Sequence, residues 1–295
     1  MRVALAVVVL PVALWHCGSK QDLIIGELRL TGGATSAGAS ASGAGAGGAV
    51  AEGGVASEPN PCPATTSPSL ANLAHRYSFD GTGTTAVDSV GANDATLLQG
   101  ATLDGSGVLS LAGRVNDQTP DQYAELPAGM ISELTDMTVV AWVTWQGGAG
   151  FQRIFDFGDS TAGVGQGDQG KSYLAMVPSS NFANGNRLGV QLAVPGFSTL
   201  SLGSNADMIE GDRYQVALVF QSGQRLALYR DGALLIESPT NVSLAMLNDV
   251  NNWIGRSQWL SNHGFHGSYD EFRIYDSALD ACQLATLRDQ GPDTP

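Results

Sequence analysis

The chain has 295 residues, so its length allows one large domain or two small ones. Its formal net charge of −14 comes from 28 acidic and 14 basic residues, with no cluster of Lys and Arg. Nucleic-acid binding is therefore not expected, because phosphate neutralisation requires a basic stripe. Glycine is enriched, at 38 residues, and much of it lies before residue 60, so this part of the chain is not expected to be globular.

The N-terminus predicts export. Residues 1–17 begin with a short positive region and continue as an apolar run that is too short to span a bilayer of ~30 Å. We predict that they are a signal peptide. The run ends at Leu14-Trp15-His16-Cys17, which resembles the lipobox of bacterial lipoproteins, although His16 stands where a small residue is usual. Two outcomes stay open: lipidation of Cys17, or its removal with the signal peptide.

Residues 18–69 are predicted to be a flexible linker. They are rich in Gly, Ala and Ser, then in Pro, and they show no apolar periodicity. Such a segment cannot bury enough apolar surface to offset the entropy lost on ordering. We expect one domain over residues 70–290, followed by a tail of disordered character at 291–295.

The two remaining cysteines, Cys62 and Cys282, lie near the two ends of this domain. The first and last strands of a sandwich often run side by side, so we predict a Cys62–Cys282 disulfide. This pairing would leave Cys17 as the odd cysteine, as expected of a lipid-bearing one.

Short segments of alternating apolar and polar residues recur through the domain, separated by Gly, Asn, Asp and Ser turns. They predict an all-β fold, a two-sheet antiparallel jelly-roll sandwich. The predicted strands are 74–79, 108–111, 123–126, 137–145, 153–157, 173–177, 188–194, 214–221, 225–229, 233–237 and 267–275.

Three local patterns refine this prediction. Both faces of residues 137–145 are apolar, which indicates a central strand. Asp231-Gly232 favours a type I′ turn between two strands. One short C-terminal helix is expected to end near Asp289, with Ser277 or Asp280 as its cap.

A characteristic order of segments runs along residues 74–288: 75–81, 86–94, 137–145, 153–158, 229–232, 252–257 and 267–275. Together they resemble the laminin-G-like, concanavalin A-like jelly-roll domains of secreted bacterial proteins. The resemblance implies a sandwich whose first and last strands are neighbours.

A metal site is predicted from aspartates near the terminal strands. Alternation along 267–275 places Asp270 on the same face as apolar residues, where a carboxylate needs a cation or several donors. Its partner would be calcium or Arg256. Asp80 ends the neighbouring first strand, and the following loop offers Asp88 and Asp94, so that these oxygens could form a calcium site.

The resemblance also implies a structural calcium near the terminal strands. The alternative is that these aspartates are ordinary turn residues.

Other candidate residues lie in the loop before the last strand. His263 and His266 are interpreted as surface residues and not as a metal pair, because no third ligand is near in sequence. Trp259 lies in a loop-like segment, so we predict that it contacts a ligand. Of the other aromatics that could stack on a sugar, Trp142, Trp145, Phe151 and Trp253, most are expected to be core residues.

No catalytic pattern is found. The chain lacks the Glu-x-Asp-x-x-Glu pattern of glucanases with this sandwich, and it lacks a Gly-x-Ser-x-Gly motif. We therefore predict a non-catalytic extracellular binding or adhesion module that recognises glycan or another envelope polymer. The alternatives are an envelope module with a protein partner, or a divergent polysaccharide hydrolase.

The expected location is the cell exterior or envelope, as an outer-membrane lipoprotein if Cys17 is lipidated. Contact with the membrane would then occur only through the lipid anchor.

Overall fold

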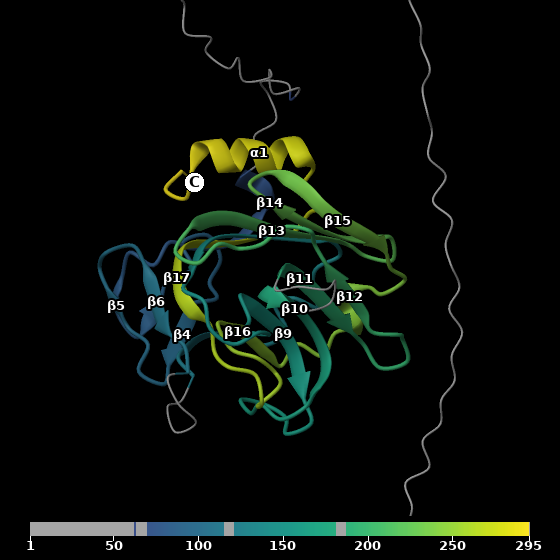
Figure 1. Cartoon of the computed structure of the whole chain (residues 1–295), viewed down its shortest axis with the longest axis horizontal. Coiled ribbons are helices and arrows are strands. Elements are labelled where there is room, and N and C mark those ends of the chain that lie inside the picture. The colour runs from purple at the N-terminus through teal and green to yellow at the C-terminus, as the bar shows by residue number, and fades with distance from the viewer. Residues whose placement is uncertain (1–61, 63–69, 115–120, 181–186, 295) are drawn as a thin grey trace, which may run out of the picture. The chain divides into compact units, whose positions relative to one another are not determined.

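The structure is a computed structural model that describes residues 62, 70–114, 121–180 and 187–294. The predicted signal peptide, Cys17 and most of the predicted linker lie outside these residues. Residues Pro59–Pro295 form one compact unit. Its strands build antiparallel sheets (Figure 1), which confirms the predicted all-β sandwich.

Strand β17, the last strand of the described chain, lies inside a seven-stranded sheet. β17 pairs with β8 on one side. On its other side it pairs with β6 through its first half and with β1 through its second half. The sheet order is β1-β17-β8-β13-β14-β15, with β6 beside β17. The bounds are β1 Leu73–Tyr77, β6 Leu109–Ala112, β8 Met137–Trp145, β13 Arg213–Gln221, β14 Arg225–Arg230, β15 Ala233–Pro239 and β17 His266–Tyr275.

The facing sheet has eight strands in the order β12-β11-β10-β9-β16-β7-β4-β3. A small two-stranded sheet and two short 3-10 helices complete the β-rich part. The bounds are β3 Thr85–Ala86, β4 Ala95–Leu98, β7 Tyr123–Leu126, β9 Phe155–Ser160, β10 Gly170–Ser180, β11 Arg187–Ala193, β12 Leu200–Gly203, β16 Asn251–Ile254, β2 Thr82–Gly83, β5 Leu103–Asp104, η1 Leu70–Asn72 and η2 Leu244–Met246.

An aromatic cluster joins the two sheets at the centre of the core. Phe155 and Phe157, both on β9, stack with ring centroids 4.6 Å apart. Phe272 on β17 approaches them edge-on, at 6.1 and 6.5 Å. All three rings are fully buried. Burial of each ring stabilises the fold by about 1.5–3 kcal/mol, so this cluster is a principal contact between the sheets.

Helix α1, Ala281–Gln290, covers the outer face of the seven-stranded sheet (Figure 1). It begins at a capping box. The Asp280 carboxylate accepts from the N–H of Gln283 at 2.8 Å, and the Gln283 side chain accepts from the N–H of Asp280 at 2.9 Å. Of the two predicted caps, Asp280 is therefore the one used. In the described part of the chain, no helix has the length and apolar character needed to cross a membrane.

The helix buries the second face of strand β8. Leu284 and Leu287 of α1 belong to a buried cluster with Val140 and Trp142 of β8. The opposite face of β8 contributes to the core between the sheets. The prediction that residues 137–145 form a central strand is confirmed.

The turn between β14 and β15 is the predicted Asp231-Gly232 pair. Both residues have positive φ, at 51° and 77°, as a type I′ turn requires. A Cβ at residue 232 would come within 2.6 Å of the Ala285 Cα, so Gly232 also allows the helix to pack closely.

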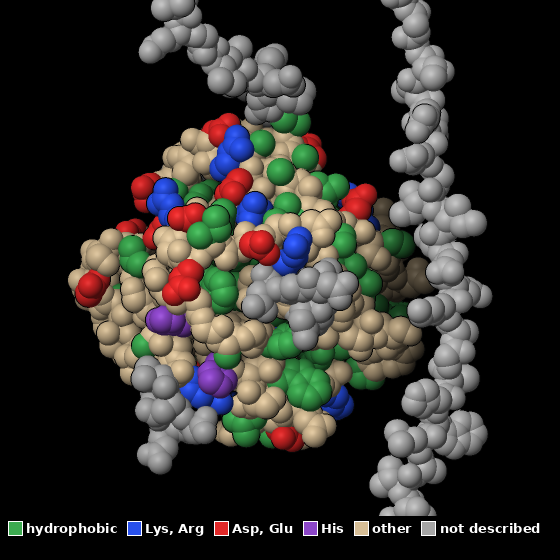
Figure 2. Space-filling view, in the orientation of Figure 1, with side chains coloured by type: hydrophobic (Ala, Val, Ile, Leu, Met, Phe, Trp, Pro, Cys, Tyr) green, Lys and Arg blue, Asp and Glu red, His purple; other side chains and the backbone are tan. Residues whose placement is uncertain are grey.

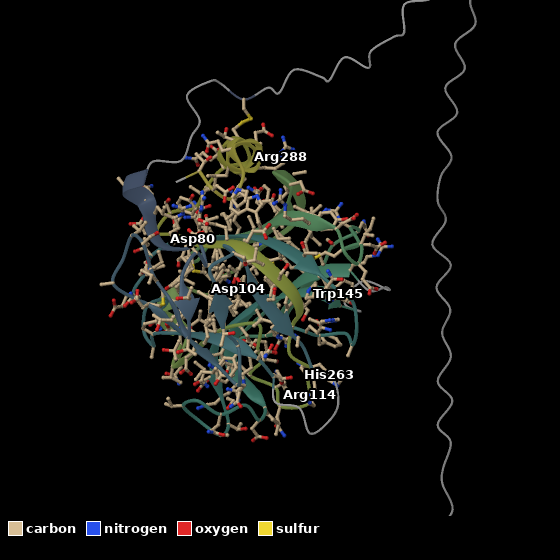
Figure 3. All side chains as sticks on the ribbon, turned by 90° about the vertical axis from the view of Figure 1, so that its left-hand side faces the viewer. Asp80, Asp104, Arg114, Trp145, His263 and Arg288 are labelled. Atoms are coloured by element: carbon tan, nitrogen blue, oxygen red, sulfur yellow. A yellow bond between two sulfur atoms is a disulfide. The ribbon has the colours of Figure 1, made fainter. Side chains whose placement is uncertain are left out.

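The two ends of the unit are joined. A disulfide links Cys62 to Cys282, whose Cα atoms are 5.3 Å apart although 220 residues separate them in sequence. Figure 3 shows this bond beside α1. The predicted disulfide is therefore present in the structure.

Residues 291–294 are not the free tail that the composition suggested. Arg273 on β17 is fully buried, and its guanidinium donates to the Pro292 carbonyl at 2.6 Å and to the Thr294 carbonyl. Arg76 donates to the same Pro292 carbonyl at 3.4 Å. A buried guanidinium needs acceptors, and the C-terminal carbonyls supply two of them.

Candidate functional site

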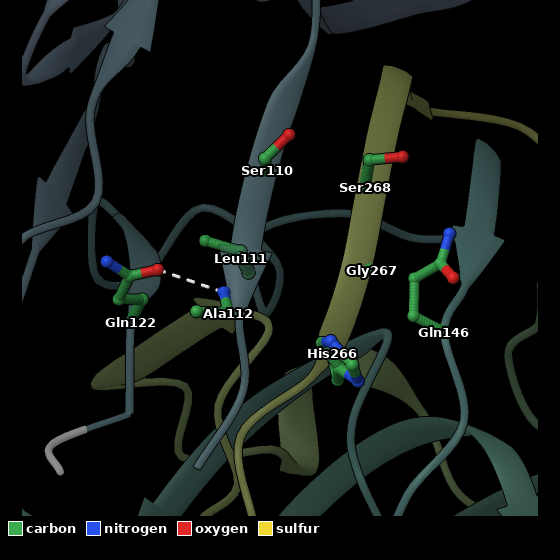
Figure 4. Close-up of a pocket in the computed structure, with 8 residues that line it drawn as sticks. All are labelled: Ser110, Leu111, Ala112, Gln122, Gln146, His266, Gly267 and Ser268. Atoms are coloured by element: carbon green, nitrogen blue, oxygen red, sulfur yellow. Dashed lines mark hydrogen bonds between the residues drawn. The ribbon is translucent and has the colours of Figure 1, made fainter. Parts of the chain in front are cut away.

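A hollow of about 430 Å³ lies on the outer face of the seven-stranded sheet, where β6 pairs with the first half of β17 (Figure 4). We call it the His266 groove. Its lining residues are Ser110, Leu111, Ala112, Gln122, Gln146, His266, Gly267 and Ser268.

Strand alternation places the polar side chains of the groove on its open side. On β6, Leu109 and Leu111 point into the core, so Ser110 points outward. On β17, Tyr269 points into the core, and Ser268 faces outward. The two serines are direct partners across the strand pair. Their hydroxyl groups are therefore neighbours on a rigid surface.

Four polar side chains of the groove are available to a ligand. Ser110, Gln146 and His266 are exposed, and Ser268 is half-buried. None of these side chains makes a hydrogen bond to another described residue. Hydroxyl and amide groups both donate and accept, and a neutral imidazole does so through its two nitrogens. The groove thus offers uncharged hydrogen-bonding groups of both kinds.

A buried amide, Gln152, fixes the two segments that carry Gln146 and His266. Its Oε1 accepts from the indole N–H of Trp145 at 3.1 Å and from the N–H of His266 at 2.8 Å. Its Nε2 donates to the Gly147 carbonyl at 3.0 Å. Because Gln152 is only 2% exposed, these bonds replace water and hold the end of β8 and the start of β17 in place.

A second hollow of about 220 Å³ continues on the other side of His266. It shares Ala112 and His266 with the groove, and Arg114 and His263 also line it. Figure 3 shows Arg114 and His263 at the end of the domain away from Arg288 and the helix.

The Arg114 side chain of this second hollow is held by Asp121. Its guanidinium donates to the Asp121 carboxylate at 2.7 and 3.1 Å, and the same carboxylate accepts from the N–H of Gly264 at 2.9 Å. The basic group in this hollow is therefore already neutralised. On the face shown in Figure 2, Lys and Arg side chains lie scattered among acidic ones.

The prediction that Asp270 lies on the apolar face of β17 is wrong. The pairing of β17 with β8 shifts between Tyr269 and Glu271, so Asp270 is the extra residue of a β-bulge. The strict alternation ends there, and Asp270 is not on the apolar face. Its carboxylate pairs at the surface with Arg213, at 3.0 Å. The predicted partner Arg256 lies instead over the Trp253 ring, at 4.1 Å.

The buried carboxylate of β17 is Glu271, which is 1% exposed. Arg76 and Arg273 donate to it at 2.5 and 2.6 Å. Burial raises the pKa of Glu271, and the two guanidinium groups lower it, with a net shift upward.

Asp88 organises its own loop. Its carboxylate contacts His75 Nδ1 at 2.7 Å and accepts from the N–H groups of Arg76, Val90, Gly91 and Asn93 at 3.0 to 3.3 Å. Burial raises the pKa of Asp88, but these hydrogen bonds outweigh it and hold the pKa below its usual value. The Asp88 carboxylate oxygens, which were predicted to bind calcium, instead accept hydrogen bonds from these protein groups.

The four predicted metal ligands do not form one cluster. Asp94 accepts from the N–H of Asp88 at 2.8 Å, and Asp80 is exposed. Among the described residues, no group of three or more His, Cys, Asp or Glu side chains could hold a metal ion. The four aspartates therefore do not assemble into the predicted ligand set, and the structural calcium itself stays a prediction.

Trp259 is half-buried. Its ring packs against a small cluster of Tyr173, Ala175 and Ala193 on the outer face of the eight-stranded sheet. A Cβ at residue 170 would lie 2.4 Å from the indole nitrogen, so Gly170 makes room for the ring. Much of Trp259 therefore has a packing role, and a ligand contact stays a prediction.

One buried carboxylate was not singled out from the sequence. Asp156 on β9 is fully buried and contacts Arg153 Nε at 3.1 Å and the N–H of Gln258 at 3.0 Å. Burial raises the pKa of Asp156 to about 6, although Arg153 opposes this. Its Oδ1 has no hydrogen-bond partner among the described residues. The pair secures the loop after β16 to the sheet.

The groove residues Ser110, Gln146 and Ser268, and the supporting Gln152, were also missed as a site. The alternation of β6 indicates that Ser110 faces outward, but the bulge at Asp270 conceals the outward direction of Ser268, and only the pairing of the two strands places the serines together. Of the loop residues discussed from the sequence, His263 and His266 line the two hollows.

Solved structures with the same fold come from several kinds of protein. Domain 4 of the extracellular arabinanase AbnA from Geobacillus stearothermophilus, solved with arabinotriose, has a TM-score of 0.54 and 18% identity, and the match covers 73% of this chain and 97% of that one. The sialidase of Trypanosoma rangeli has a TM-score of 0.53 and 17% identity, and the match covers 75% of this chain but only 33% of the sialidase. The binding domain of botulinum neurotoxin DC, solved with rat synaptotagmin II, has a TM-score of 0.51 and 12% identity. The match covers 72% of this chain and 52% of that one.

At these identities the likeness establishes the fold alone. Comparison by sequence with curated proteins gave no match. A family model described as the concanavalin A-like lectin/glucanases superfamily matches residues 116–285, which is more than half of the chain. The chain therefore belongs to the concanavalin A-like lectin/glucanases superfamily.

Proposed function

We propose that this protein is a non-catalytic glycan-binding module and that it binds through the His266 groove. The observation that carries this proposal is the set of four accessible polar side chains, Ser110, Gln146, His266 and Ser268, without partners among the described residues. Sugar hydroxyls need donors and acceptors at fixed positions, and two paired strands provide such positions.

The fold supports the same class of ligand. The family includes lectins by its description, and the arabinanase domain of the same fold was solved with arabinotriose. A neutral or weakly charged glycan is favoured, because no Lys, Arg, Asp or Glu lines the groove.

The absence of carboxylates from the groove lining supports binding without hydrolysis. Glycosidases generally act through two carboxyl groups on either side of the bond that is cleaved. The nearby Asp270 is paired with Arg213, and Asp156 is fully buried. Incubation with polysaccharides that released reducing ends or unsaturated sugars would favour the alternative, a divergent hydrolase or lyase.

Export and anchoring form the second part of the proposal. We place the domain outside the cell, held by a lipid on Cys17, with an envelope glycan or protein as partner. The Cys62–Cys282 disulfide supports an oxidising location. Mass spectrometry of the mature protein tests the anchor: an N-terminus beyond residue 17 without a diacylglyceryl mass would exclude it.

The glycan site is tested by a glycan array followed by calorimetry with the best ligand. Gln146→Ala and Ser268→Ala each remove a side-chain hydrogen-bonding group. A lost neutral hydrogen bond costs about 0.5–1.5 kcal/mol, so each variant should bind about 2- to 12-fold more weakly.

The matched control for these variants is Gln224→Ala, at an exposed glutamine in the β13–β14 turn, which should bind as the parent does. Equal affinity of all three variants would exclude the groove as the site. A pull-down from envelope extract tests the protein-binding alternative. It would be favoured by a captured partner that saturating sugars failed to displace.

A further inference from the structure

A separate hollow of about 250 Å³ lies where the edge strands of the two sheets meet. It is formed by the β11–β12 turn and by the segment that follows β15. In Figure 1, β12 and β15 lie together on one side of the sandwich, and β6 lies on the opposite side. We call this hollow the Phe197 groove. Its lining residues are Leu192, Phe197, Ser198, Thr199, Leu200, Pro239, Thr240, Asn241 and Val242.

Phe197 presents an aromatic ring to solvent at the rim of this groove. Its side chain is 42% exposed, whereas most phenylalanines of the described chain are fully buried. The residue is held in a turn, in which its N–H donates to the Val194 carbonyl at 3.1 Å and the preceding Gly196 has a φ of 89°. The turn thus fixes the position of an exposed ring that the core does not use.

Uncharged polar groups surround this ring. Ser198, Thr199 and Asn241 are exposed, and their side chains make no hydrogen bond to another described residue. The lining contains no ionisable side chain. Below them, Leu192 and Val242 are buried and form an apolar floor.

The segment that carries Asn241 is fixed from both sides. The N–H of Thr240 donates to the Gln224 carbonyl at 3.0 Å, and the Val242 carbonyl accepts from the N–H of Gly223 at 2.8 Å. The Thr240 hydroxyl accepts from the N–H of Val242 at 3.1 Å. Asn241 therefore projects from an ordered backbone, which lowers the entropy cost of binding through it.

We infer that the Phe197 groove is a second saccharide subsite, which takes one uncharged sugar ring. An aromatic face pairs with the C–H face of a sugar, and the hydroxyl and amide groups around it match the sugar's own hydroxyls. A volume of about 250 Å³ is below the ~300–1,000 Å³ of pockets for larger ligands, so the subsite holds a single ring and not a long chain.

The inference rests on the proposed function for the ligand class, but it depends on different residues. With subsites on opposite sides, one domain would hold two glycan chains or two parts of one polymer. Its apparent affinity for a polymer would then exceed that for short oligosaccharides.

The test is an NMR titration of the full chain with neutral arabino-, xylo- and gluco-oligosaccharides of three to six units. The side-chain amide signals of Gln146 and Asn241 report separately on the two grooves. We expect both signals to shift. Phe197→Ala should weaken the response of Asn241 by at least tenfold and leave that of Gln146 unchanged, whereas Phe197→Trp should retain both.

Ile209→Ala is the matched control, because Ile209 is a hydrophobic residue that is 59% exposed outside both grooves. Thermal melts establish that each variant is folded. A shift of Gln146 alone, or an unchanged Asn241 response in Phe197→Ala, would overturn the second subsite and leave the proposed function intact. A shift of Asn241 alone would support the subsite and remove the His266 groove from the proposal, and no shift at either would remove both.

Discussion

Replacement of the disulfide should cost much of the stability of the domain. The bond closes a loop of 220 residues, from Cys62 to Cys282. In the chain-entropy account, such a crosslink removes conformations mainly from the unfolded chain, and a loop of this length corresponds to about 5 kcal/mol. The double variant Cys62→Ser, Cys282→Ser should be less stable by up to this amount.

The folded structure should change little in this variant. Cys282 lies in the first turn of α1, and the helix is held on the sheet by Leu284 and Leu287 and by its own cap at Asp280. Circular dichroism and glycan affinity should therefore match those of the parent. The loss should appear in the free energy of unfolding alone.

Urea unfolding followed by tryptophan fluorescence measures the effect. With an m-value of roughly 2–3 kcal/mol/M, a loss of 5 kcal/mol lowers the midpoint by about 2 M. The parent protein in reductant should unfold like the double variant, and reductant should not change the variant further. A midpoint that stays within about 0.3 M of the parent would refute the entropic argument for this protein.

Two further predictions concern buried polar groups. Gln152→Leu leaves the Trp145 indole and the His266 N–H without their acceptor. It should therefore destabilise the domain by about 2–4 kcal/mol and weaken glycan binding, as chemical unfolding and calorimetry would measure. Unchanged affinity in a folded variant would contradict the positioning role of Gln152. Asp156 has a folded-state pKa of about 6, above the ordinary 3.8, so its contribution to stability should be fully present below about pH 4 and lost as pH rises through 6. Asp156→Asn should remove roughly 2 kcal/mol of pH dependence between pH 7 and 4. An identical pH profile of unfolding in the variant would contradict this assignment.

Much of the fold was predictable because its strands obey simple alternation. The strand at Met137–Trp145 and the strand at Tyr123–Leu126 have the predicted bounds, and the Asp231-Gly232 turn has the predicted conformation. In each case, the local pattern and the three-dimensional environment agree.

The strand β16, Asn251–Ile254, escaped prediction because two asparagines occupy buried positions. Asn251 donates to the Gln258 side chain at 3.1 Å, and Asn252 donates to the Asp249 carboxylate at 3.0 Å. These bonds give acceptors to the N–H groups of both buried amides, whereas the Asn252 Oδ1 has no hydrogen-bond partner among the described residues. The sequence shows polar residues where the structure has a fully buried strand.

The site was harder to predict than the fold. The bulge at Asp270 reverses the alternation along β17, and nothing in the local sequence marks it. The His266 groove depends on the pairing of β6 with β17, between segments more than 150 residues apart. Which outward serine meets which is a property of register and not of either segment alone.

The central place of β17 constrains when the domain can fold. Until residues 266–275 are synthesised, β8 lacks a neighbour on one side, and β1 and β6 have no strand to pair with in their sheet. A partial chain would expose these unpaired edges, so folding must wait for the last strand. The native sheet should therefore assemble only after most of the chain has been synthesised.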